Sequence, residues 1–183
     1  MQHYFIGVKL PEDLACRLVD VRREWQLERS HKRLPAAVDL HITLLYLGAV
    51  EAEVLTELKS ELNELTGVIP VMDVTLTGVS TFGNPSTPSV IYTSIEEQPN
   101  LHKLQRSILE KCLNLLLQLD QKPFVPHITL AKKWSGKQDV FSKEMHIEKT
   151  SFTMKDFSIY TINPGEVPSY QAIHTIYLKD LTT

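Results

Sequence analysis

VDLHITLLYLG at residues 38–48 and PFVPHITLAK at residues 123–132 share the tetrapeptide HITL. In a strand, successive side chains point to opposite faces of the sheet. Each copy therefore places its histidine and threonine on one face, and its isoleucine and leucine on the other. The apolar pair can anchor the strand in a core while the polar pair faces outward. Each copy thus predicts a rigid platform that carries an imidazole beside a hydroxyl.

The repetition is hard to attribute to chance. With this chain's own content of His, Thr and Leu, a shuffled sequence should hold about 0.08 matches to H-x-T-L, so two matches should occur roughly once in three hundred shuffles. A lone histidine in such a chain is usually an ordinary strand or surface residue. We interpret the other five histidines in this way: His3, His31, His102, His146 and His174. The duplicated context favours a shared chemical role for His41 and His127.

The segments around the two copies show strand and helix patterns. Period-2 alternation and β-branched or aromatic residues predict strands, whereas leucines at three- and four-residue spacing predict helices. We expect strands at 4–10, 38–48, 71–83, 90–95, 127–133, 150–162 and 169–178, helices at 11–27, 51–65 and 99–119, and a loop at 28–37. Short turns join neighbouring strands, which favours antiparallel sheets and an α+β class. No stretch resembles a linker, so we expect one domain over residues 1–183 with two halves.

Composition excludes some classes of partner and location. The chain is 43% hydrophobic and 22% charged, with a net charge of -3, so a polyanionic partner must be held by a local positive patch. The N-terminal residues do not fit a signal peptide, and no apolar run approaches the roughly 18 residues that a membrane span needs. We expect a cytoplasmic monomer that has no membrane partner. Candidate patches are Lys132, Lys133 and Lys137 with Trp134, and the basic run His31, Lys32 and Arg33.

Two imidazoles across a cleft suit the cleavage of a phosphodiester. The attacking water must lose a proton on one side of phosphorus while the leaving oxygen gains one on the other, and histidine titrates close enough to neutrality for both tasks. The hydroxyls of Thr43 and Thr129 can donate to the non-bridging phosphate oxygens. This scheme requires no metal. A metal site would want further ligands at HxH or HExxH spacing, and a serine hydrolase would want a GxSxG motif, but neither pattern is present.

The two motifs and their surroundings resemble the 2H phosphoesterase superfamily. Within it, the chain is most similar to the bacterial and archaeal RNA 2',3'-cyclic phosphodiesterases, historically called 2'-5' RNA ligases. The first motif leads into YLG at 46–48, and the second follows Pro126 and precedes Ala131 and Lys132. The resemblance covers nearly the whole chain, from YFIGVKLP through GVSTFG to FSIYTINPG with Tyr170.

This resemblance implies a fold, an activity and a site. The fold would be bilobal α+β, with two pseudo-symmetric lobes of antiparallel sheet, backed by helices, around a central cleft. The activity would be metal-independent hydrolysis of 2',3'-cyclic phosphate ends of RNA or nucleotides to 2'-phosphomonoesters, with no cofactor, and with 2'-5' ligation in reverse as a further option. His41 would protonate the leaving 3'-oxygen and His127 would activate water, or the reverse, while Thr43, Thr129 and Lys132 would bind the phosphate.

Two departures from the family pattern bear on the substrate. Many members have Arg where this chain has Lys132, which keeps the positive charge but loses bidentate phosphate geometry. The middle turn often carries Pro-Arg, whereas here Pro88 precedes Ser89. Two alternatives therefore stay open beside RNA-end hydrolysis. One is an RNA- or nucleotide-binding module without turnover, and the other is a phosphodiesterase for a small cyclic nucleotide.

Overall fold

The computed structural model describes residues 2–115, 117, 119, 122–136 and 145–180. Three α-helices and nine strands make up the fold within these ranges. In chain order they are β1 His3–Lys9, α1 Glu12–Glu24, β2 His31–Arg33, β3 His41–Ala49, α2 Ala52–Asn63, β4 Met72–Asn84, β5 Thr87–Ile95, α3 Pro99–Asn114, β6 His127–Trp134, β7 Thr150–Met154, β8 Asp156–Ile162 and β9 Tyr170–Tyr177.

The strands form one continuous sheet. Its order is β7-β4-β5-β6-β3-β1-β8-β9, with β2 added beside β6. Every pair of neighbouring strands runs antiparallel. The antiparallel α+β class expected from the sequence is therefore confirmed. Between β3 and β6 the ladder contains the single residue pair Ile42 and Ile128, so the two halves of the sheet meet at a narrow seam.

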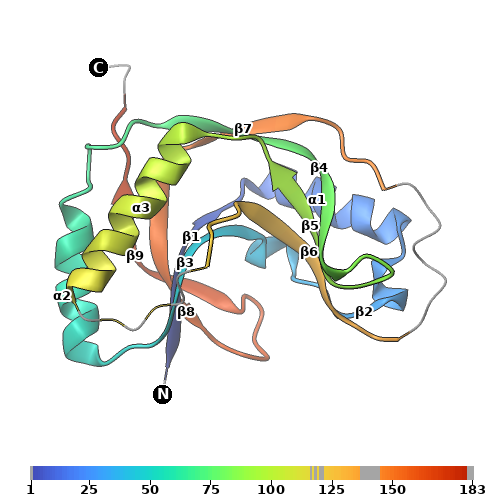
Figure 1. The fold of residues 1–183 in the computed structure, drawn as a ribbon, viewed down its shortest axis with the longest axis horizontal. Helices are drawn as coiled ribbons and strands as arrows, with labels where there is room; N and C mark the ends of the chain where they lie inside the picture. Colours follow the sequence, from blue (N-terminus) through green and yellow to red (C-terminus); the bar gives the residue numbers. More distant parts are fainter. Residues whose placement is uncertain (1, 116, 118, 120–121, 137–144, 181–183) are drawn as a thin grey trace.

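The arrangement on the two sides of this seam is symmetric. Read outward from the seam, β6-β5-β4-β7 on one side corresponds to β3-β1-β8-β9 on the other. The helices cross over between the halves. The segment that joins β1 to β3 contains α1, which contacts β6, and the segment that joins β5 to β6 contains α3, which contacts β3. Figure 1 shows α2 and α3 together beside β1 and β9, with α1 beside β4 to β6.

The apolar side chains of the two motif strands anchor the seam in the core. Ile42, Leu44, Ile128 and Leu130 are all 2% exposed or less, as period-2 alternation predicted. Leucines of the helices complete this core, because each helix buries the stripe of residues at three- and four-residue spacing. The buried leucines are Leu14 and Leu18 of α1, Leu55, Leu58 and Leu62 of α2, and Leu101 and Leu104 of α3.

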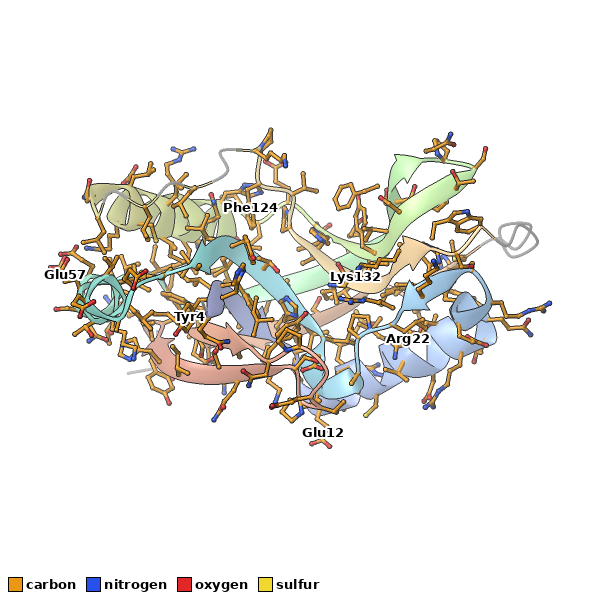
Figure 2. All side chains as sticks on the ribbon, turned by 90° about the horizontal axis from the view of Figure 1, so that it is seen from below. Tyr4, Glu12, Arg22, Glu57, Phe124 and Lys132 are labelled. Carbon is orange, nitrogen blue, oxygen red and sulfur yellow. The ribbon has the colours of Figure 1, made fainter. Side chains whose placement is uncertain are left out.

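One buried charge ties a crossover helix to the second motif. Arg22 of α1 is 7% exposed. Its guanidinium donates to the backbone carbonyl of Pro35 and, at 3.4 Å, to that of Leu130 on β6. A buried charge is tolerated when its donors are satisfied in this way. Figure 2 shows Arg22 reaching from its helix toward the sheet. The contact fixes α1 and the segment before β3 against the strand that carries His127.

Three sequence-based expectations were wrong in detail. The polar segment 28–37, expected as a loop, contains β2, because backbone pairing with β6 does not depend on apolar side chains. The single strand expected at 150–162 is two strands. One of them, β7, pairs with β4 at one end of the sheet, and β8 pairs with β1 in the other half. The third helix ends at Asn114 rather than at 119.

Within the described ranges, no helix is both long and apolar enough to cross a membrane. The cytoplasmic location, the monomeric state and the single-domain organisation over residues 1–183 stay predictions.

Candidate active site

The seam between β3 and β6 brings the two motifs together. Ile42 and Ile128 lie opposite each other in the antiparallel register and are fully buried. Because neighbouring residues of a strand point to opposite faces, the histidine and threonine of each motif share the other face. The pair Ile42 and Ile128 is flanked on one side by His41 and Thr129, and on the other side by Thr43 and His127.

A large cavity opens on this polar face. Its volume is about 730 Å³, within the range of small-molecule sites. Four of the five predicted site residues line it: His41, Thr43, Thr129 and Lys132. His127 does not line the cavity, but it lies close enough to His41 to lower the pKa of that imidazole. Most of the remaining wall comes from β2 with the segment after it, and from the turn between β8 and β9, and Phe5 of β1 and Tyr46 of β3 also line it.

His41 is fixed by one backbone carbonyl and two aromatic rings. Its Nδ1 lies 2.7 Å from the carbonyl oxygen of Asp39, which can only accept, so Nδ1 carries the proton. In the neutral ring Nε2 is then an acceptor, and the hydroxyl of Thr43 donates to it at 3.0 Å. The rings of Phe5 and Tyr170 pack against the imidazole with centroids 4.7 and 4.9 Å away. Only Nε2 is left to exchange a proton in the cavity.

His127 is held in the same manner. Its Nδ1 donates to the carbonyl oxygen of Val125 at 2.7 Å, again two residues before the histidine. The rings of Phe82 and Tyr92 pack against it with centroids 5.1 and 5.0 Å away. Among the described residues, Thr129 makes no hydrogen bond that would match the one from Thr43 to His41. Both imidazoles therefore present Nε2, from similar aromatic surroundings.

Burial makes both imidazoles less basic. It lowers the pKa of His41 to about 4, an effect that Lys132 and His127 increase and that the hydrogen bond to Asp39 and the Asp39 charge oppose. Burial also lowers the pKa of His127, by less, against the hydrogen bond to Val125. The desolvated ring loses more stability when charged than when neutral, which explains the direction. At neutral pH both rings are mainly neutral in the ligand-free protein.

Asp39 links His41 to the turn that covers it. Its side chain is buried, and its carboxylate accepts the backbone N–H of Ser169 at 2.9 and 3.1 Å and that of Tyr170 at 3.3 Å. Its own carbonyl holds Nδ1 of His41. One residue therefore fixes the imidazole and the start of β9, which places the Tyr170 ring. The sequence analysis did not select Asp39. Its position two residues before the motif is the signal that could have identified it.

The basic residues proposed from the sequence differ in whether they line the cavity. Lys132, half-buried on β6, lies opposite Arg33 of β2 in the antiparallel register. Burial lowers the pKa of Lys132, and the charges of Arg33 and Lys133 lower it further. Lys32 and Arg33 line the cavity, whereas Lys133 does not. The ring of Trp134 packs edge-on against buried His31, 5.5 Å between centroids. Lys137 lies outside the described residues.

In the part of the chain that the structure describes, no three His, Cys, Asp or Glu side chains gather in a way that could hold a metal ion. The described groups of the site are imidazoles, hydroxyls, ammonium and guanidinium groups, and the carboxylate of Asp39. They can donate and accept protons and bind a phosphate.

Comparison with known proteins gives a consistent result. Residues 11–164 match the family described as the 2'-5' RNA ligase superfamily. An RNA 2',3'-cyclic phosphodiesterase of Bacillus subtilis is 28% identical over 179 residues, which are 97% of each chain. One of the same name from Geobacillus stearothermophilus is 28% identical over 93% of this chain, which spans only 55% of that relative. In structure, the chain is similar to E. coli LigT complexed with 3'-AMP, with a TM-score of 0.82 and 20% identity over 97% of this chain and 98% of LigT. At that identity the likeness shows the fold alone.

Proposed function

Because this chain belongs to the 2'-5' RNA ligase superfamily, we propose that it hydrolyses 2',3'-cyclic phosphate ends of RNA or nucleotides to 2'-phosphomonoesters. Relatives that match most of this chain carry the name RNA 2',3'-cyclic phosphodiesterase. The observation that carries the proposal is the cavity at the seam, where both motifs meet on one polar face. The reaction uses no metal or cofactor.

The reaction joins one water to phosphorus and releases one ribose oxygen. A neutral imidazole takes a proton from the water at its Nε2 while the water oxygen bonds to phosphorus. The bond from phosphorus to the 3'-oxygen breaks, and a protonated imidazole gives its Nε2 proton to that oxygen. The product is a 2'-phosphate beside a free 3'-hydroxyl. The backbone carbonyls that accept from Nδ1 of His41 and His127 keep both rings in the tautomer this exchange requires.

The two pKa shifts support an assignment of roles. The more strongly lowered pKa of His41 favours the neutral ring, which is the form that a base needs. His127, whose pKa is lowered less, takes up a proton more readily and suits the acid. We therefore favour His41 as the base and His127 as the acid, the reverse of the order first taken from the family resemblance. The negative charge of the bound phosphate would help to keep the acid protonated.

The remaining predicted residues would hold the phosphate. Thr129 and Lys132 line the cavity beside His41, so a hydroxyl and an ammonium group can donate to the non-bridging oxygens. The Thr43 hydroxyl, which donates to His41 in the ligand-free protein, would turn to the phosphate when substrate binds. Lys132 would act as a single point charge rather than a bidentate clamp. The reverse reaction, 2'-5' ligation, would use the same groups.

The first test is turnover of an oligoribonucleotide that ends in a 2',3'-cyclic phosphate, with EDTA present. The wild-type protein should produce a 2'-phosphate end. His41→Ala and His127→Ala should each slow turnover at least roughly a hundredfold, because each removes a general acid or base. His102→Ala is the matched control, since this histidine lies on α3, packs on Phe124 and does not line the cavity.

Two results would contradict the proposal. Activity that EDTA abolishes would exclude the metal-free reaction. Wild-type protein without turnover, or both motif variants as fast as the His102→Ala control, would assign the motifs to binding or to structure. A protein that protects cyclic ends without cleaving them would then be an RNA- or nucleotide-binding module.

A further inference from the structure

The basic side chains that line the cavity carry more positive charge than the single negative charge of a cyclic phosphate can neutralise. Lys32, Arg33 and Lys132 all line it, in a chain whose net charge is -3. Among the lining residues the one carboxylate is that of Asp39, and it already accepts the backbone N–H groups of Ser169 and Tyr170. The basic residues are therefore gathered at one wall, where none of the described lining residues is an acid free to neutralise them.

Within the described part of the chain, no counter-ion is paired with these cations. Of the described residues, none forms a hydrogen bond or an ion pair with the side chains of Lys32, Arg33 or Lys132. Some cations elsewhere are paired, as where Lys111 meets Glu61 and Glu64 at 3.1 and 2.6 Å. Antiparallel pairing sets Arg33 opposite Lys132, so two like charges lie on adjacent strands. Such a pair destabilises the empty protein and favours a bound anion between them.

The position of the wall formed by Lys32, Arg33 and Lys132 suggests which anion binds there. Lys132 follows Thr129 by three residues, a separation of about 10 Å along an extended strand. Lys32 and Arg33 lie one strand further from the motifs. The cyclic phosphate carries one negative charge, and the next anionic group of the same nucleotide is its 5'-phosphate, across the ribose. Long basic side chains at the wall can reach that group while the cyclic end lies between the two imidazoles.

We propose that Lys32 and Arg33 form a second anion subsite, which binds the 5'-phosphate of the nucleotide whose cyclic end is cleaved. The subsite rests on the proposed function and narrows its substrate class. The 5'-phosphate can be a monoester on a free nucleotide or the diester that continues an RNA chain. Both present the same phosphate oxygens, and Lys132 lies between the subsite and the reactive phosphate.

Three substrates separate these possibilities. They are adenosine 2',3'-cyclic phosphate, the same nucleotide with a 5'-phosphate, and a dinucleotide with the same cyclic end. We expect kcat/KM to rise about tenfold from the first substrate to the second and third, because hydrogen bonds to a charged group are among the stronger ones. A larger gain with the dinucleotide identifies an RNA chain as the source, and a larger gain with the 5'-monophosphate identifies a free nucleotide.

Substitutions Arg33→Gln and Lys32→Gln test whether these two side chains bind the 5'-phosphate. Each variant should reduce the ratio of kcat/KM with a 5'-phosphate to kcat/KM without one, and Arg33→Lys should restore part of it. Lys103→Gln, which removes one charge from an exposed position on α3, should leave the ratio unchanged. A wild-type ratio near one, or ratios unaffected by either substitution, would overturn the subsite alone. Absence of turnover of the first substrate and of the oligonucleotide would instead overturn the proposed function.

Discussion

His41 and His127 lie in similar aromatic surroundings, yet their proton affinities differ. The base must be neutral and the acid protonated in the same molecule, so kcat/KM should follow a bell-shaped pH profile. With the proposed roles, its acid limb would reflect His41, whose pKa is about 4, and its alkaline limb would reflect His127, whose pKa is below the usual range. We expect the maximum between about pH 4 and 6.5, measured on a cyclic mononucleotide. A maximum above pH 7 would contradict this assignment.

Two charges near His41 should move the acid limb in opposite directions. Lys132 lowers the pKa of His41, whereas the carboxylate of Asp39 raises it. Lys132→Gln should therefore shift the acid limb to higher pH, and Asp39→Asn should shift it to lower pH. The measurement is the pH dependence of kcat/KM relative to each variant's own maximum, which removes any overall loss of activity. Shifts of the same sign would show that rearrangement, rather than charge, dominates the response.

Individual residues of the site were predictable to different degrees. The repeated HITL selected two histidines and two threonines, because strand alternation fixes which side chains share a face. Asp39 could have been noticed only from its position two residues before the first motif, since its role depends on backbone N–H groups at Ser169 and Tyr170, distant in the sequence. The aromatic partners Phe82 and Tyr92 were missed for the same reason. Which side chains pack on an imidazole depends on strand pairing, which composition does not determine.

At the scale of the elements, Gly7 sets the spacing between β1 and β3. A Cβ at this position would lie 2.7 Å from the backbone oxygen of Ile42 and 2.9 Å from a ring carbon of Phe5. Gly7→Ala should force β1 away from the strand that carries His41, and so lower the free energy of unfolding by about 1–3 kcal/mol. Urea unfolding of the variant measures this change.

Gly78 provides the matched control for this substitution. It lies inside β4, and an added Cβ there would meet nothing within 4 Å. Gly78→Ala should be neutral or slightly stabilising, because alanine restricts the unfolded chain more than glycine does. If both variants lost equal stability, the close approach at Gly7 would not be the cause.

The helices and strands themselves were easier to predict than the pairing of the strands in the sheet. The helix patterns at 11–27 and 51–65 correspond to α1 and α2, since amphipathic spacing is a local property. The strand expected at 150–162 satisfied every local criterion, yet the chain changes neighbours at Lys155, from β4 to β1. Nothing in a period-2 pattern records which strand lies beside it.

At the scale of the whole molecule, the crossover helices make the halves depend on each other. Because α1 contacts β6 and α3 contacts β3, each half of the sheet is covered in part by a helix that connects strands of the other half. We expect thermal unfolding to occur in one cooperative transition, with calorimetric and van't Hoff enthalpies equal. Two resolved transitions, or loss of the motif face before the rest, would show that the halves fold separately.

The symmetric strand order could not be read from the sequence. A repeated motif predicts two similar strands, but it does not place them side by side or state that only Ile42 and Ile128 pair between them. The family resemblance supplied the expectation of two pseudo-symmetric lobes with a cleft. The connection of both halves into one sheet was seen only in the structure.

The contact between α1 and β6 has a consequence for synthesis on the ribosome. Arg22 and Leu130 are separated by 108 positions in the chain. At about 5–20 residues per second, α1 leaves the ribosome roughly 5–20 seconds before its partner strand does. During that interval its apolar stripe lacks the cover that β6 provides. The nascent chain must therefore tolerate an exposed amphipathic helix, and a chaperone that binds such helices should associate with it until the second motif emerges.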